Sequence, residues 1–501
     1  MKKLMVVAIG VCVASVAVAG DFEIEGSVLA KWNGEAETVL IPSGVKCVGD
    51  RAFKDRDRLT SITIPNGVTE IMEEAFSGCE SLNALNIPES VAVIDKYAFL
   101  DCRSLTSVTI PSGVSEVGVG VFRGCRSLAS VTIPEGVKSI NTEAFYNCGK
   151  LSSVAIPRGV VEIGEYAFSG CYSLTSITIP ESVTEIREGA FIGCGGLTSI
   201  TIPKGVTEIR AKTFLDCRSL ASVTIPEGVK KIDHLAFNDC HSLASIIIPN
   251  GVREIGNGVF KGCGELTSIT IPDSVRKIGE SAFRGCGSLT ALNIPKGVRS
   301  VSWFAFQECK NLTSITIPEG VTEIGEEAFS GCGKLTTLNI PESVTEIGGG
   351  AFRGCGSLTA LNIPEGVREI GAEAFSECKK LTSMEIPIGV ERINGRTFYG
   401  CGELTSITIP ESVTEIGKEA FRGCGKLASI TIPEKVTEIG GGAFRGCGSL
   451  TTLTLPKNVW KIGKGAFLGC NGLLEVKLSR RTEVERDAFS GCDMVKLSYC
   501  D

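Results

Sequence analysis

Cysteine, histidine and carboxylate side chains are the groups of this sequence that could act as nucleophiles, bases or metal ligands. The chain has 501 residues, with 22 Cys and only 2 His. The histidines, His234 and His241, flank Asp239 and Cys240. A nucleophilic cysteine needs a base within hydrogen-bond reach, and one short stretch of chain offers no pocket to exclude water. Because Cys240 is also one member of a long periodic series, we predict that the protein is not an enzyme.

That series consists of 18 cysteines that recur every 23 residues, from Cys79 to Cys470. One thiol per 23 residues matches no compact zinc signature, whose ligands are paired closely in sequence. Adjacent repeats would bring their Cα atoms to roughly 5 Å, within disulfide range, but with parallel side chains. Free cysteine is also a good small buried hydrophobe. We therefore favour buried thiols over scattered disulfides and over metal ligation, and we predict neither a metal nor a cofactor.

Two further thiols lie outside this series. Cys47 occupies a position that holds Glu in most repeats, so we expect its side chain to point outward. An exposed thiol could form an intermolecular link, but a neutral substitution in the first repeat is the favoured interpretation. The role of Cys500, near the end of the chain, stays open.

The elements that must position these residues share the same period, since all 19 prolines also recur every 23 residues. In a representative unit, Ile315 and Ile317 alternate as in a strand, and Pro318 ends that strand because proline cannot donate to a ladder. Phe329 and Cys332 then have the i, i+3 spacing of one helical or 3₁₀ turn. One unit cannot bury its apolar face alone, whereas stacked units form parallel strands and internal ladders. The expected ladder members include Phe260, Phe283, Phe329, Cys263, Cys286 and Cys332.

The repeated unit resembles the BspA-type, or treponemal-type, leucine-rich repeat. Its motif, L-x-x-I-x-I-P-x-x-V-x-x-I-x-x-x-A-F-x-x-C, recurs with few departures from about Leu40 to Cys492. The resemblance implies a right-handed solenoid of 23-residue coils, with a parallel sheet on one face and short turns or 3₁₀ segments on the other. It also implies a surface or secreted protein with adhesive or protein-binding roles. We expect an N-terminal capping module at 20–39, the array at 40–492, and a C-terminal cap or tail at 493–501.

The first 19 residues have the form of an export signal. Lys2 and Lys3 precede an apolar run, and Ala17-Val18-Ala19 matches the small-residue cleavage pattern, with cleavage expected after Ala19. We find no second hydrophobic span, so we predict an extracellular or cell-surface protein, or a periplasmic one, without an integral membrane span. The net charge of −7 argues against a nucleic-acid partner.

Residues that face away from the core are the binding candidates. The strands carry outward polar side chains, among them Thr201, Thr316, Asn339 and Asn362. Threonine also stabilises sheets through cross-strand stacking without any ligand. Large aromatics replace small or polar residues at Trp303, Phe304 and Trp460. Exposed aromatics are enriched at interfaces, while packing against an adjacent coil is the alternative.

A ladder of glutamates follows the second extended segment of the coils, for example at Glu323, Glu346 and Glu369. Stacked like charges are costly unless they are solvated or alternate with bases, so we interpret the ladder as a solvated face and calcium as the minority view. Together these features predict an exported scaffold that binds a protein or glycan through many weak sites. A self-associating structural component of a surface or matrix is the alternative.

Overall fold

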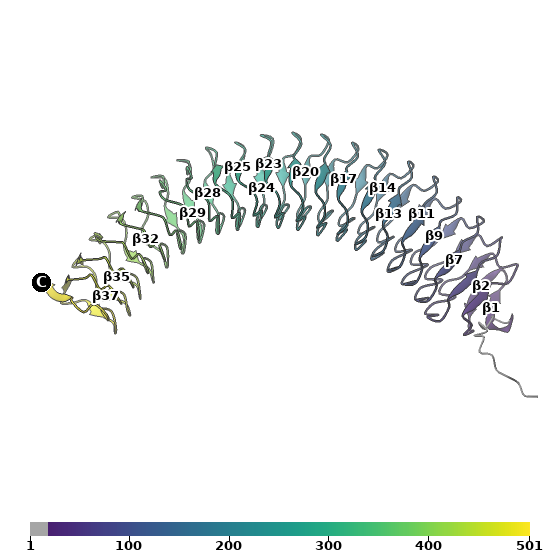
Figure 1. The fold of residues 1–501 in the computed structure, drawn as a ribbon, viewed down its shortest axis with the longest axis horizontal. Helices are drawn as coiled ribbons and strands as arrows, with labels where there is room; N and C mark the ends of the chain where they lie inside the picture. Colours follow the sequence, from purple (N-terminus) through teal and green to yellow (C-terminus); the bar gives the residue numbers. More distant parts are fainter. Residues whose placement is uncertain (1–18, 501) are drawn as a thin grey trace, which may run out of the picture. The chain divides into compact units, whose positions relative to one another are not determined.

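The computed structural model describes residues 19–500. The chain divides into two compact units, Met1–Val206 and Thr207–Asp501. Within each unit, equivalent strands of successive coils pair side by side, as Figure 1 shows for the purple-to-blue and the teal-to-yellow strands. Apart from Ala19, which opens a 3₁₀ turn at Ala19–Asp21, the predicted leader lies outside the described residues.

The first unit begins with an antiparallel hairpin of β1 (Phe22–Glu25) and β2 (Val28–Trp32), after which β2 pairs in parallel with β4 (Cys47–Val48). Each coil then contributes a first strand and a two-residue second strand. The first strands are β3 (Thr38–Leu40), β5 (Ser61–Thr63), β7 (Ala84–Asn86), β9 (Ser107–Thr109), β11 (Ser130–Thr132), β13 (Ser153–Ala155), β15 (Ser176–Thr178) and β17 (Ser199–Thr201). The second strands are β4 (Cys47–Val48), β6 (Glu70–Ile71), β8 (Val93–Ile94), β10 (Glu116–Val117), β12 (Ser139–Ile140), β14 (Glu162–Ile163) and β16 (Glu185–Ile186).

The second unit repeats the same plan, except that three of its described coils, those of Glu346–Ile347, Glu369–Ile370 and Glu438–Ile439, have a second strand without an assigned first strand. Its first strands are β19 (Ser222–Thr224), β21 (Ser245–Ile247), β23 (Ser268–Thr270), β25 (Ala291–Asn293), β27 (Ser314–Thr316), β31 (Ser383–Glu385), β33 (Ser406–Thr408), β36 (Thr452–Thr454), β38 (Glu475–Ser479) and β40 (Lys496–Cys500). Its second strands are β18 (Glu208–Ile209), β20 (Lys231–Ile232), β22 (Glu254–Ile255), β24 (Lys277–Ile278), β26 (Ser300–Val301), β28 (Glu323–Ile324), β29 (Glu346–Ile347), β30 (Glu369–Ile370), β32 (Arg392–Ile393), β34 (Glu415–Ile416), β35 (Glu438–Ile439), β37 (Lys461–Ile462) and β39 (Glu483–Val484).

The sequence pattern sets the register of these strands. In β27, Ile315 is buried while Ser314 and Thr316 are exposed, as period-2 alternation requires. Identical spacing places Asn293 of β25 directly beside Thr316, and the strands run parallel. A slip of one residue would turn every isoleucine outward, so burial of one face fixes the pairing.

A chain of turns follows each second strand. Cys263 N–H bonds to Phe260 C=O (3.1 Å) within its coil, whereas Phe260 N–H bonds to Ala282 C=O (2.8 Å) of the following coil. Gly262 lies in the left-handed region with φ +76°, a conformation that glycine adopts without steric cost. Alternating bonds inside and outside the coil prevent a continuous helix, so the stretch consists of short turns, and the fold prediction of short turns or 3₁₀ segments is confirmed.

Phenylalanine rings form the core beside these turns. Phe260 and Phe283 are fully buried, and their ring centroids stack 5.4 Å apart. Phe306 and Phe329 repeat the arrangement at 5.5 Å. Burial of such a side chain is worth about 1.5–3 kcal/mol, and each ring contacts equivalent rings on both sides. The parallel-strand solenoid of 23-residue coils is thereby confirmed.

Candidate functional site

The outward polar side chains of the first strands form an exposed surface in each unit. In the first unit, Ser107 and Thr109 of β9 lie beside Ser130 and Thr132 of β11. Thr201, at the end of β17, is exposed in the same way. In the second unit, Asn293 and Thr316 are adjacent on β25 and β27. We call these outward residues of the first strands the strand face.

Asn339 and Asn362 extend the strand face in the second unit. Both are exposed, and an isolated parallel bridge joins their backbones. The structure therefore brings two of the predicted binding residues together. It gives them a hydrogen-bonding surface of side-chain amides, each of which can donate and accept.

A groove of about 510 Å³ is hollowed beside Asn293 and Thr316. The apolar side of its lining includes Ile271 and Pro318. The charged side chains that line it, from three successive coils, are Asp273, Lys296 and Glu319. Apolar walls with a few polar groups are typical of binding sites. The sequence reasoning missed these three charged residues, although they follow the repeated prolines at positions where residue type varies.

The glutamate ladder lies on the second strands. β28, β29 and β30 pair in register, which places Glu346 between Glu323 and Glu369. Partial desolvation and then the two neighbouring carboxylates raise the pKa of Glu346. No group of acidic, histidine or cysteine side chains suited to a metal ion occurs among residues 19–500. The ladder is therefore a surface of mutual repulsion at this point.

Basic residues relieve the repulsion elsewhere in the ladder. Lys277 Nζ lies 3.0 Å from Glu254 Oε1, and Lys461 Nζ lies 3.1 Å from Glu438 Oε1. Exposed ion pairs of this kind contribute little each, about 0–1 kcal/mol. Their effect is to divide a stripe of negative charge into patches that carry both positive and negative charge.

The predicted aromatic sites occupy two different positions of the coil. Trp303 is 50% exposed and lies over Gly325, where an added Cβ would come 2.6 Å from the indole Cδ1. Its neighbour Phe304 is half-buried, with the guanidinium of Arg284 5.8 Å from the ring centroid. Trp303 and Phe304 thus combine packing on adjacent coils with an accessible indole surface.

Trp460 lies on the chain just before β37 and is 51% exposed. The ammonium group of Lys461 is 6.0 Å from its ring centroid, at the outer limit of a cation–π contact. Its position in the coil differs from that of Trp303, so the two tryptophans do not form one patch.

The ladder thiols make a contact that sequence reasoning did not foresee. Cys263 Sγ donates to the carbonyl of Phe237 (3.2 Å), and Cys286 Sγ donates to that of Phe260 (3.1 Å). Cys332 Sγ makes the same bond to Phe306 (3.2 Å). All three thiols are buried. A small side chain with a weak donor fits this position, because it both fills the core and satisfies a carbonyl of the preceding coil.

Burial controls the ionisation of these thiols. Desolvation raises the pKa of Cys309 and of Cys355 to about 12, and the backbone hydrogen bond offsets it only in part. Cys240 is buried too, and its Sγ donates to the Phe214 carbonyl (3.2 Å). His241 Nδ1 instead lies 2.8 Å from the Gly262 carbonyl oxygen. These contacts give Cys240 the role of a ladder member.

Cys47 is half-buried on β4, next to Glu70 of β6. Partial burial and then the carboxylates of Glu70 and Asp50 raise the pKa of its thiol. This environment lowers the thiolate fraction and with it the reactivity.

Comparison with known proteins settles the family. The family described as "BspA type Leucine rich repeat region (6 copies)" matches residues 30–152, 138–267, 253–382 and 368–496. The chain belongs to the BspA-type leucine-rich repeat family. No curated protein matches it.

Solved leucine-rich repeat proteins resemble this BspA-type chain. A leucine-rich repeat protein from Bacteroides ovatus is 30% identical, with 82% of this chain and 88% of that chain covered and a TM-score of 0.46. A leucine rich cell surface protein from Faecalibacterium prausnitzii is 23% identical over 97% of this chain and 94% of that chain, with a TM-score of 0.31. Within residues 19–500, no helix is long and apolar enough to cross a membrane.

The first prediction concerns the glutamate ladder. Glu346→Gln should raise the urea midpoint of unfolding at neutral pH, because it removes one of three stacked carboxylates. Glu254→Gln is the matched control, since Glu254 pairs with Lys277, and it should leave the midpoint unchanged or lower it. Equal effects of the two substitutions would show that the ladder carries no repulsion.

The second prediction concerns alkaline pH. Folding raises the thiol pKa from an ordinary value of 9.0 to about 12 at Cys309 and Cys355. Below pH 9 both states hold the proton, so the full stability is present. Above pH 9 the thiols of the unfolded state lose protons that the folded state keeps. The free energy of unfolding should therefore fall by about 1.4 kcal/mol per pH unit per thiol.

Urea unfolding between pH 8 and pH 12 measures this slope. Cys309→Ala should make the fall of the free energy of unfolding with pH less steep, by the contribution of one thiol. A free energy of unfolding that does not change over this range would contradict the burial of protonated thiols.

Proposed function

We propose that the protein is an exported scaffold that binds a protein, or a glycan of the cell exterior, through the strand face. The observation that carries this proposal is the groove beside Asn293 and Thr316. It combines apolar walls, outward hydrogen-bonding groups and charges of both signs. Such a mixture suits a polar macromolecular surface better than a small apolar ligand.

Repetition of the coil supports binding at several places along one unit. Similar outward groups recur from strand to strand, as at Ser107 and Ser130 or at Thr109 and Thr132. Each contact is weak, because exposed hydroxyls exchange hydrogen bonds with water at little net gain. Simultaneous engagement of several coils raises the overall affinity without one strong pocket.

The leader predicted at residues 1–19 supports export. Membership of the BspA-type leucine-rich repeat family supports a protein-interaction scaffold. The described contacts also support a non-enzymatic role, because the thiols of the array point into the core as ladder members. Trp303, with half its surface exposed, is a second contact point for a partner.

Self-association is the second candidate function, and β40 favours it. This five-residue strand is the last in the order β36–β38–β40, so one of its edges has no neighbouring strand among the described residues. Tyr499 of this strand is exposed, and so is Met494, two residues before the strand begins. An unpaired edge with exposed apolar side chains is a template for pairing with another chain.

A binding assay with a strand-face variant tests the proposed function. The wild-type protein is first used to capture extracellular proteins and glycans, and the affinity of the enriched ligand is measured. The triple variant T270R/N293R/T316R places three bulky cations on adjacent strands and should weaken binding by about tenfold or more. Each of these side chains is exposed, so the variant should keep the wild-type fold.

The matched control is Glu280→Arg combined with Glu326→Arg, two exposed positions on the turn side of the same coils. This control should bind like the wild type. Failure to enrich any ligand, or equal loss in both variants, would contradict binding through the strand face. Light scattering of the unliganded protein reports on self-association, and a stable monomer would overturn that candidate.

A further inference from the structure

One segment of the second unit occurs twice with the same sequence. Residues 344–359 and residues 436–451 both read VTEIGGGAFRGCGSLT. Each copy places three glycines and then one arginine, Arg353 or Arg445, on the turn side of its coil. In a solenoid each coil contacts only its neighbours. Any difference between the surroundings of the two arginines therefore comes from the adjacent coils.

The arginine of the first copy is paired on both sides. Arg353 Nη1 lies 3.9 Å from Glu327 Oε1 of the preceding coil and 3.3 Å from Glu373 Oε2 of the following coil. Both contacts are ion pairs with exposed or half-buried carboxylates. The charge of Arg353 is thus balanced by side chains of the protein itself.

The arginine of the second copy has lost both of these partners. The preceding coil offers Glu419, but its two carboxylate oxygens lie 2.7 Å from Arg396 Nε and 2.7 Å from Arg422 Nη1. The following coil has Gly465 where the first copy has Glu373. Arg445 consequently forms no ion pair with any residue that the structure describes.

Two lysines lie on either side of the same coil. Lys418 and Lys464 stand where the first copy is flanked by a glutamate and an alanine. Gly441 lies between them, and a Cβ added there would contact only the Lys464 backbone, 3.3 Å from its carbonyl oxygen. Both lysines are exposed, and neither makes an ion pair among residues 19–500. Three cations without partners thus surround a place where a side chain is missing.

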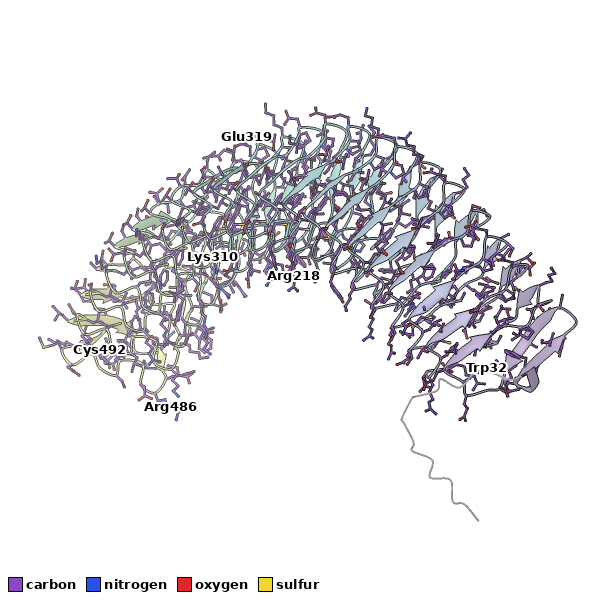
Figure 2. All side chains as sticks on the ribbon, turned by 45° about the vertical axis from the view of Figure 1, so that its right-hand side comes forward. Trp32, Arg218, Lys310, Glu319, Arg486 and Cys492 are labelled. Carbon is purple, nitrogen blue, oxygen red and sulfur yellow. The ribbon has the colours of Figure 1, made fainter. Side chains whose placement is uncertain are left out.

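The missing side chains leave a hollow of about 470 Å³. Its lining includes the three cations and the glycines Gly441, Gly442 and Gly465. The last coil, whose Arg486 is labelled in the yellow part of Figure 2, adds Asp487 and Ser490. Glu419 also lines the hollow, but its charge is already balanced by two guanidiniums outside the lining. Three cations less the carboxylate of Asp487 leave an excess of two positive charges.

We propose that this hollow binds a phosphate group. A phosphate monoester carries a charge of about −1.5 to −2 near pH 7, which matches the excess in the lining. Arg445 supplies a planar fork of donors, and the lysines supply point charges from the coils on both sides. The volume is many times the roughly 30 Å³ of one water, so it also has room for a sugar-sized group that carries the phosphate. This site lies on the turn side and is independent of the strand face.

Calorimetric titration of the purified protein at low ionic strength tests the proposal, because salt screens exposed charges. The probes are inorganic phosphate, glucose 6-phosphate, glucose and acetate. Both phosphates should bind saturably, acetate at least about tenfold more weakly, and glucose not at all. Tighter binding of glucose 6-phosphate would identify an ester as the source of the group, and equal or tighter binding of inorganic phosphate would identify the free ion. No saturable binding of either phosphate, or acetate bound as tightly, would overturn the site.

Gly465→Glu restores the carboxylate that pairs with the arginine in the first copy. A Cβ at Gly465 makes only ordinary contacts, the nearest 3.7 Å away at Leu468 Cβ. Glutamate also occupies this position, with a similar positive φ, at Glu327, Glu373 and Glu419. The variant should therefore fold, and it should weaken phosphate binding by at least about tenfold. Gly465→Gln is the matched control, since it adds the same bulk without charge and should lose clearly less affinity. Equal losses in the two variants would contradict recognition by charge.

The lysines are tested together. Lys418→Gln combined with Lys464→Gln should weaken phosphate binding by at least about tenfold. Arg353→Gln changes the paired arginine of the first copy and should bind phosphate like the wild type. Wild-type affinity in the double lysine variant, or an equal loss in Arg353→Gln, would overturn the assignment to this hollow. Thermal melting of each variant verifies that it is folded.

Discussion

The structure depends on the carbonyl group of each ladder phenylalanine, which joins one coil to the next. The Phe237 carbonyl accepts the N–H of Cys240 within its own coil (3.2 Å) and the thiol of Cys263 from the following coil (3.2 Å). The ring of Phe237 stacks on Phe260 at 5.8 Å. A buried carbonyl must be satisfied, and here the same residue pair also fills the core. The last coil keeps the same contacts although it is one residue shorter, since Phe489 stacks on Phe467 at 5.1 Å and Cys492 Sγ donates to the Phe467 carbonyl (3.1 Å).

Much of this arrangement could be predicted from the sequence. The alternation at Ile315 and Ile317, the strand-ending Pro318 and the fixed spacing of phenylalanines determine the strands and their register. The bond from the thiol to the carbonyl could not be predicted, because spacing alone does not give the direction of a side-chain donor. The turn conformation was also ambiguous, since i, i+3 spacing fits both a 3₁₀ turn and turns whose alternate N–H groups bond to the next coil.

The surfaces were harder to predict than the core, because they depend on residues that the repeat leaves free. The exposure of Trp303 and Trp460 agrees with their departure from the repeat. The charged lining of the groove near Thr316 comes from three coils at once, and only the stacking brings these residues together.

Alkylation of thiols followed by intact mass measurement tests this account most directly. The account predicts that the native protein protects the buried ladder cysteines from alkylation, because the core excludes reagent and the thiols remain protonated. Denaturation without a reductant should then expose all of them as free thiols. Rapid labelling of the ladder cysteines in the native protein, or a denatured mass that shows disulfide bridges among them, would contradict the thiol ladder.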